Sequence, residues 1–296
     1  MQKNGPFALA FNFLVVAFVL APLVIVCLVA FTPESTLTVP TSSFSLRWFY
    51  AVFEHPNFMQ AFKNSLWLAF LSASIAVCLA VPAAIAITRY RFPGRDALNG
   101  LFLSPLMIPH LVLGVALLRF FALMGMAGSF PWLVASHVVV ITPYVMRLVI
   151  GALVGFDRSI EHAALSLGAS RATVFFQVTL PLIIPGVSGG WLLAFINSFD
   201  ELTMSVFITA PSTITLPVRM YMYATESIDP MMAAVSALVI GLTAVTMLLL
   251  DRVYGLDRVL VGQKLDRCRQ PQRRRGRHGN TETPGRNRPA RFDVHL

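Results

Sequence analysis

Long apolar stretches with few charges recur along most of the chain. A helix needs about 20 apolar residues to cross a hydrocarbon core of roughly 30 Å. Stretches of this length recur often enough to predict an all-α membrane protein with six transmembrane helices. The predicted spans are residues 7–31, 65–87, 98–121, 131–154, 187–209 and 232–250.

Several of these spans contain proline. We expect the spans to accommodate it, because neighbouring helices can hydrogen-bond to the carbonyl groups that a proline leaves free. The prolines within the predicted spans include Pro22, Pro82, Pro105, Pro109 and Pro143.

The composition agrees with a membrane protein. Apolar residues make up 56% of the chain, charged residues only 12%, and the mean hydropathy is +0.70. Such a chain has too few polar groups to cover a soluble surface. Cys27, Cys78 and Cys268 lie far apart in the sequence, which predicts neither a disulfide framework nor a metal-ligand cluster.

The formal net charge of +9 is concentrated near the C-terminus. Residues 1–250 carry 11 Lys/Arg and 9 Asp/Glu, whereas residues 251–296 carry 12 and 5. Residues 270–292 almost lack apolar side chains, so we expect a disordered basic tail at 259–296 after a transmembrane domain at 1–258. Its plainest role is attraction to anionic lipid headgroups, and nucleic-acid binding is not expected, because no aromatic residues are interleaved for base stacking.

The positive charges of the short loops predict the orientation. Arg89, Arg91 and Arg95 follow the second span, and Arg158 and Arg171 follow the fourth. Loops rich in Lys and Arg remain in the cytoplasm. Both termini are then cytoplasmic.

The loop between the fourth and fifth spans, residues 155–186, is too long for a simple turn. Ser159 is a candidate N-cap for a helix at about 159–167, with Glu161 in its first turn. Gly168 is expected to end this helix. A helix, a glycine bend and a second helix should result.

The second helical piece begins at Ser170. We expect it to run toward Leu180, where Pro181 and Pro185 redirect the chain into the fifth span. The residues themselves allow two interpretations of the loop: an elbow that only connects two spans, or a compact knob that docks into a partner.

The run EHAALSLGASRATVFFQVTLPLIIPG in this loop resembles the EAA loop of binding-protein-dependent ABC importer permeases. His162 stands where that pattern has Glu, with Glu161 one place earlier. The matching positions are Ala163, Ala164, Gly168, Leu180 and Pro181. The resemblance implies that the loop is a coupling helix, which docks into a cytoplasmic ATPase subunit through Glu161, His162, Ala163, Ala164, Gly168, Leu180 and Pro181.

The stretch after the loop, GWLLAFINSFDELTMSVFITAPSTITLPVRMY, is similar to permeases of the spermidine/putrescine type. The resemblance implies the type I ABC importer permease fold, with six spans and a cytoplasmic coupling helix. It also implies three kinds of partner: a second permease subunit, a dimer of ATPase subunits that bind ATP and Mg, and a soluble solute-binding protein. This chain itself is expected to hold no cofactor.

Asp200 and Glu201 are charges within the predicted fifth span. If that helix begins near Val187, Asp200 lies roughly 20 Å along it. Carboxylates are costly in lipid, so they should face the interior of the helix bundle or a watery cavity. They either pair with Arg119 or Arg147, or they line a path for a cationic solute.

The neighbouring residues favour the second alternative, a path for a cationic solute. Trp191 and Phe199 offer ring faces for cation–π contacts, and Asn197 is a plausible polar liner. The predicted substrate pathway is therefore Asp200, Glu201, Phe199, Asn197 and Trp191.

No other pattern points to chemistry within the chain. His110 and His137 are interpreted as hydrogen-bonded packing residues, and no metal site is expected. The sequence contains no nucleotide-binding, nucleophile-elbow or zinc-protease motif. The chain is therefore not expected to be an enzyme.

The predicted function is import of a polyamine, or of a related small cation, across the bacterial inner (plasma) membrane by alternating access. A separate ATPase subunit would drive it. Three alternatives stay open: an ABC permease for another solute such as a phosphonate or ferric ion, a membrane enzyme, and a stand-alone channel.

Overall fold

The computed structural model describes residues 5–39, 43–227 and 229–254. Within these ranges the chain forms helices and no strand. The predicted tail at 259–296 and the boundary at 258 lie outside the described residues. The helices are α1 (Pro6–Val29), α2 (Arg47–Glu54), α3 (Pro56–Arg89), α4 (Arg95–Leu103), η1 (Ser104–Met107), α5 (His110–Leu123), α6 (Phe130–Gly155), α7 (Ser159–Ser166), α8 (Arg171–Val174), η2 (Phe175–Thr179), α9 (Leu180–Phe199), α10 (Ser205–Ile208), α11 (Leu216–Glu226) and α12 (Pro230–Tyr254).

Four helices of the described part are long and apolar enough to cross a membrane. A bent pair adds a possible fifth span, and α12 contains a shorter apolar helix at Pro230–Thr246. The all-α membrane class is confirmed, while the number of six spans stays a prediction. The four long helices are Phe7–Val29, Pro56–Arg89, Phe130–Gly155 and Arg171–Phe199.

The third predicted span, 98–121, contains a sharp bend and is not one continuous helix, and its crossing of the membrane stays a prediction. The helix at Arg95–Met107 meets α5 at a bend of 104°. Pro109 explains the break, because a proline disfavours helical backbone at the preceding residue, and Ile108 has an extended ψ of 127°. By contrast, Pro22, Pro82 and Pro143 lie inside unbroken helices.

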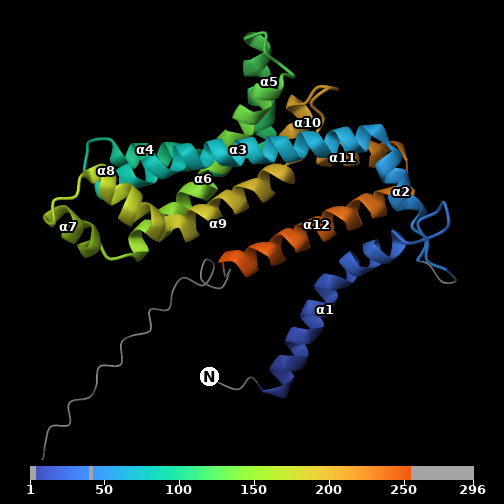
Figure 1. The fold of residues 1–296 in the computed structure, drawn as a ribbon. Helices are drawn as coiled ribbons and strands as arrows, with labels where there is room; N and C mark the ends of the chain where they lie inside the picture. The colour runs from blue at the N-terminus through green and yellow to red at the C-terminus, as the bar shows by residue number, and fades with distance from the viewer. Residues whose placement is uncertain (1–4, 40–42, 228, 255–296) are drawn as a thin grey trace, which may run out of the picture. The chain divides into compact units, whose positions relative to one another are not determined.

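Three helices, α3, α6 and α9, pack side by side and hold most of the larger core (Figure 1). Ala76 and Ala80 of α3 are fully buried between them. α9 approaches α6 closely at Gly186, where a Cβ atom would lie 2.5 Å from Cβ of Ala152. Small side chains allow this close packing, which is what holds helices together in lipid.

A second cluster of buried side chains joins the C-terminal end of α1 to α2, α11 and α12. Ala30 and Ala234 are fully buried in it. Trp48 of α2 adds a hydrogen bond from Nε1 to the Glu34 carbonyl at 3.1 Å. Most of α1 is exposed outside this cluster, as expected for a helix whose apolar surface faces lipid or another subunit.

Candidate functional site

The segment between α6 and α9 contains the helix, glycine bend and second helix that the sequence predicts. α7 ends at Ser166, and Gly168 follows with a φ of +88°. This left-handed conformation carries no Cβ penalty in glycine. Ser170 caps α8, because its Oγ accepts a hydrogen bond from the Thr173 amide at 3.1 Å.

The start of α7 differs from the prediction. Ser159 is the first helical residue, and its amide donates to Oδ1 of Asp157 at 2.9 Å. The predicted cap by the Ser159 side chain was therefore wrong, and Asp157 supplies the accepting oxygen. The hydrogen bond from Ser159 holds the pKa of Asp157 below its ordinary value.

The junction of the loop with α9 also differs. We predicted a redirection at Pro181 and Pro185, but α8, η2 and α9 form one continuous helix. η2 is a π-turn, in which the Leu180 amide donates to the Phe175 carbonyl. This wider turn lies just before Pro181, whose missing N–H removes a helical hydrogen bond in any case. Leu180 and Pro181 therefore begin α9.

The loop motif presents most of its residues outward. All eight residues of α7 are described, and none is buried. His162, Ala163 and Gly168 are exposed, and Ala164 is half-buried. Leu167, just beyond the helix, is 89% exposed. The outer face of the loop is thus made of small, apolar and imidazole groups.

Glu161 instead points into the molecule. Its Oε1 accepts a hydrogen bond from the Thr179 hydroxyl at 2.7 Å, and its Oε2 lies 3.3 Å from Nε of Arg89. The Arg89 guanidinium stacks 4.6 Å from the ring centre of Phe156, and Arg158 donates to the Arg89 carbonyl at 3.2 Å. One carboxylate therefore joins α7 to the end of α3 and to η2. The sequence marked Glu161 but gave no sign of Arg89 or Thr179 as its partners.

Asp200 and Glu201 lie just beyond the C-terminal end of α9, not inside a helix. The helix does not begin near Val187, as the prediction supposed, and Asp200 follows its last residue. The continuous helix begins at Arg171 and ends at Phe199. The two acids belong to a break of non-helical backbone between α9 and α10.

Glu201 is held from two sides. Its Oε1 accepts a hydrogen bond from the Met204 amide at 2.8 Å, and its Oε2 lies 2.9 Å from Nδ1 of His110. His110 begins α5, so the broken third span meets the break after α9 at this contact. The considered pairing with Arg119 or Arg147 was wrong: in the described part of the chain, neither has a carboxylate oxygen within 4 Å.

His137 of α6 joins the two helices on either side of the break. Its Nδ1 lies 2.9 Å from Oγ of Ser198, and its Nε2 lies 3.0 Å from Oγ of Ser205. The side chain is fully buried. A neutral imidazole has one donor and one acceptor nitrogen, so it satisfies both hydroxyls. Both histidines are hydrogen-bonded, as the sequence predicts, although only His137 is buried.

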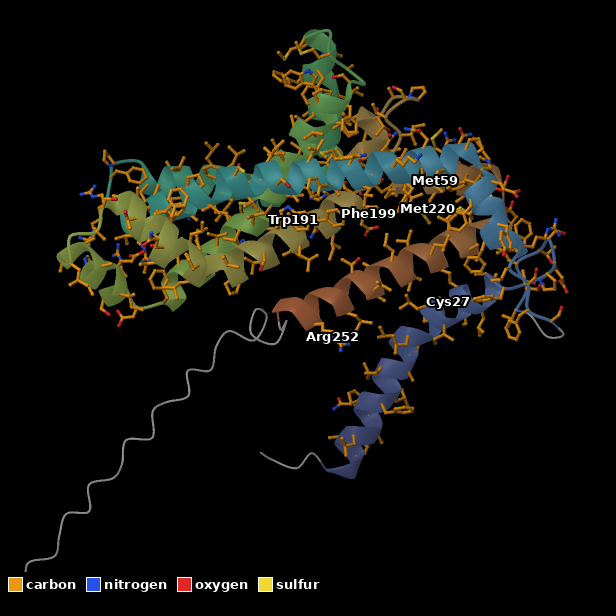
Figure 2. The ribbon with its side chains drawn as sticks, viewed as in Figure 1. Cys27, Met59, Trp191, Phe199, Met220 and Arg252 are labelled. Carbon is orange, nitrogen blue, oxygen red and sulfur yellow. The ribbon has the colours of Figure 1, made fainter. Side chains whose placement is uncertain are left out.

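Three aromatic rings form a row along α9, just before Asp200 in the chain. Figure 2 labels the first and the last of them, Trp191 and Phe199. The ring centres of Trp191 and Phe195 are 5.4 Å apart, those of Phe195 and Phe199 are 6.2 Å apart, and both pairs are stacked. Nε1 of Trp191 donates to Oγ of Ser74 at 3.2 Å, which fixes its ring. The row lies on one wall of a cavity of about 460 Å³. The cavity is lined by Leu66, Trp191, Leu192, Phe195, Ile196, Phe199, Asp200, Val239, Leu242, Thr243 and Thr246.

Not every predicted pathway residue reaches this cavity. Asn197 does not line it, and its side-chain amide donates to the Leu193 carbonyl at 2.8 Å. Phe195 was not predicted, although its spacing of four residues from Trp191 and from Phe199 places all three rings on one helix face. No sequence pattern indicated that Thr243 of α12 lines the cavity, because only the fold brings it opposite α9.

The chain is similar to known transport proteins. Residues 76–255 match the family described as binding-protein-dependent transport system inner membrane component. The chain is 33% identical over 234 residues to the spermidine/putrescine transport system permease protein PotC of Haemophilus influenzae, covering 79% of this chain and 91% of that protein. It is 32% identical over 247 residues to the putrescine transport system permease protein PotI of Escherichia coli K12, covering 80% and 87%.

A solved structure supports the fold. The bacterial alginate ABC transporter in complex with an alginate pentasaccharide-bound periplasmic protein aligns with a TM-score of 0.64 and 16% identity, covering 87% of this chain and 95% of that one. At this identity the likeness shows the fold alone, and it confirms the predicted fold of an ABC importer permease. The chain therefore belongs to the family of binding-protein-dependent transport system inner membrane components, which are multi-pass membrane subunits of transporters and not enzymes.

Proposed function

We propose that this chain is a permease subunit of an ABC importer for polyamines such as spermidine and putrescine. The observation that carries the solute class is the row of three stacked rings that ends at Asp200 within one cavity. Relatives named for spermidine and putrescine transport, which align with most of the chain, support the same solute.

A linear polyamine matches this cavity chemically. Its ammonium groups are attracted to the faces of aromatic rings and to a carboxylate, and its methylene groups pack against apolar side chains. Glu201 is already engaged by His110 and by the Met204 amide, whereas Asp200 is exposed and lines the cavity. Asp200 is therefore the acid that receives the cation, and Glu201 supports the backbone next to it.

The loop around α7 is the docking element for the ATPase. His162, Ala163 and Gly168 face outward, together with the exposed Leu167. Small side chains permit close backbone approach by a partner, and an exposed leucine at the tip of a loop gains from being covered. Leu180 and Pro181 begin the helix that carries any movement of this loop toward Asp200.

This loop end is the cytoplasmic end. Arg158 donates to the Arg89 carbonyl, so the two arginine-rich loops lie together, and Arg-rich loops stay in the cytoplasm. Both termini then lie inside the cell.

The complete importer also contains a second permease, an ATPase dimer that binds ATP and Mg, and a soluble binding protein on the outer side. Alternating access follows when the ATPase dimer closes and shifts the loop, because the solute can bias this cycle only through unequal affinity for the two states.

Uptake of labelled putrescine and spermidine by cells that express the whole importer tests the proposal. Asp200→Asn removes one charge-assisted contact, which is worth about 1.5–3 kcal/mol, so the KM for uptake should rise about tenfold or more. Glu226→Gln, at the exposed end of α11, is the matched control and should leave KM unchanged. An unchanged KM in Asp200→Asn removes this residue from the path, and absence of polyamine uptake by the unaltered importer rejects the solute class.

A further inference from the structure

α7 is poorly anchored by packing. None of its eight residues is buried, although the helix contacts α8 and η2. A helix without a buried side chain transmits little force through van der Waals contacts, because it can slide over its neighbours. Its link to the transmembrane helices must therefore be sought in polar contacts.

The carboxylate of Glu161 supplies that link. Its two oxygens contact two different elements: Oε2 approaches Nε of Arg89 at the end of α3, and Oε1 accepts from the Thr179 hydroxyl in η2. The Arg89 and Glu161 side chains are only 10% and 14% exposed. Within the described ranges, this is the one contact below 4 Å between a carboxylate and an arginine or lysine.

Both partners of Glu161 are themselves fixed. The Arg89 guanidinium lies over the ring of Phe156, at the end of α6, and the Arg89 carbonyl accepts from Arg158. Thr179 is buried and is the last residue of the π-turn that precedes α9. Single π-turns inside α-helices are frequent at functional sites. α9 then continues for 20 residues, about 30 Å, to Asp200.

We propose that Glu161, Arg89 and Thr179 form a latch that makes α7 move together with α3 and α9. The inference rests on the proposed docking of the loop to an ATPase. Glu161 is then a positioning residue that faces inward and carries the movement, while the exposed residues around it meet the ATPase. Without the latch, the ATPase still binds and hydrolyses ATP, but α7 shifts alone and the transmembrane helices do not follow.

The latch differs from a purely stabilising ion pair in what its loss should change. A stabilising pair lowers the amount of assembled importer but leaves each assembled importer fully coupled. A latch leaves assembly intact and lowers the transport achieved for each ATP hydrolysed. The ratio of these two quantities therefore separates the two roles.

The test uses the whole importer, with its own ATPase, second permease and binding protein, in proteoliposomes. The variants are Glu161→Ala, Arg89→Ala and the charge exchange Glu161→Arg with Arg89→Glu. Asp96→Asn, an exposed acid in the first turn of α4, is the matched control. Assembly, ATP hydrolysis with and without the binding protein, and uptake of labelled putrescine are measured on the same preparations.

We expect both single variants to assemble and to hydrolyse ATP. Stimulation of hydrolysis by the binding protein, and uptake per ATP, should fall about tenfold, a usual size for coupling between two sites. The charge exchange should recover part of both, and Asp96→Asn should behave as the unaltered protein. Wild-type coupling in the single variants overturns the latch. The latch is also overturned if the single variants only lose assembly, the charge exchange restores it, and the uptake per ATP of each assembled importer is the same in all variants.

These outcomes are separate from those of the polyamine proposal. If the unaltered importer takes up no putrescine but its hydrolysis still responds to the binding protein, the solute class is wrong. The latch is then judged on stimulated hydrolysis alone.

Discussion

The two ends of α9 are held in place by different kinds of contact. At the loop end, a charged carboxylate joins α7 to α3 and η2 beside exposed residues. At the other end, the break after Phe199 is held by the neutral, fully buried His137, which bonds a serine on each side of the break. The first contact connects an exposed helix to the core, whereas the second lies within the core.

From this difference we expect the break after Phe199 to be rigid and the loop end of α9 to be the part that moves. Irregular backbone at membrane depth is tolerated only where its polar groups are satisfied within the protein or by water in a cavity. His137 bonds the hydroxyls of Ser198 and Ser205 and Glu201 accepts from the Met204 amide, so we expect the backbone that carries Asp200 to be rigid. The loop end is joined to the core by the Glu161 carboxylate, and the exposed residues beside it are where a partner can act. Changes at the break should therefore lower stability first, and changes at the loop should lower coupling first.

The largest expected effect is that of His137→Leu. It leaves the hydroxyls of Ser198 and Ser205 buried without their partner, and each such group costs about 1–3 kcal/mol. We expect the free energy of unfolding to fall by about 2–4 kcal/mol, because both groups are affected. A lower apparent melting temperature of the detergent-purified importer measures it. Asp96→Asn, at an exposed position in α4, is the control and should leave that temperature unchanged. Equal melting temperatures for the two variants would show that the break does not depend on His137.

The sequence predicts the features at the two ends of α9 only where they depend on contacts between residues close together in the chain. The bend at Gly168 and the start of the second helical piece at Ser170 follow from local backbone and side-chain preferences, and both were predicted correctly. The EAA-like motif also located the loop. Local sequence preference did not predict the N-cap of α7 correctly, because Asp157 and not Ser159 supplies the oxygen that accepts from an amide at its start.

The remaining features needed contacts between distant residues. The hydropathy pattern showed apolar stretches but did not reveal that the third one bends at Pro109 or that the fifth ends at Phe199. Glu161 meets Arg89, which lies 72 positions earlier in the chain, and Glu201 meets His110, 91 positions earlier. No periodicity within a single helix encodes such pairs, so both acids were recognised from the sequence while their partners were not.

The next largest effect is expected for Glu201→Gln, which tests whether two adjacent acids have different roles. The glutamine oxygen still accepts from the Met204 amide, but the charge opposite His110 is lost. We expect a loss of about 1–2 kcal/mol in stability and little change in the KM for polyamine. Asp200→Asn should show the reverse, with a higher KM and an unchanged melting temperature. If Glu201→Gln raises KM as much as Asp200→Asn does, both acids contact the solute and the break is not merely a support.

Gly168→Val tests the loop end. Nothing lies within 4 Å of a Cβ at this position, so the cost is backbone strain alone, at a φ of +88°. A left-handed residue with a Cβ costs about 1–2 kcal/mol, and the loop should relieve this strain by changing its bend. We expect transport and ATPase binding to be lost while membrane insertion and melting temperature stay nearly normal. Gly151→Val, in the helical α6 and equally free of contacts, is the control. Retained ATPase binding and uptake in Gly168→Val would remove the bend from the docking element.

The smallest expected effect distinguishes two serines in the same loop. Ser170→Ala removes the hydroxyl that accepts from the Thr173 amide, and loss of such a cap costs about 1 kcal/mol. Ser159→Ala should cost less, because Asp157 and not the Ser159 side chain accepts the amide at the start of α7. Hydrogen exchange of the loop amides in the assembled importer measures both: faster exchange at α8 in Ser170→Ala, with α7 unaltered in Ser159→Ala. Faster exchange at α7 in Ser159→Ala would instead assign the cap to Ser159. Neither change touches the Glu161 latch, so both variants should keep the wild-type ratio of uptake to ATP hydrolysis. A lowered ratio in either variant would show that coupling depends on the folding of the loop and not on its connection to α3 and α9.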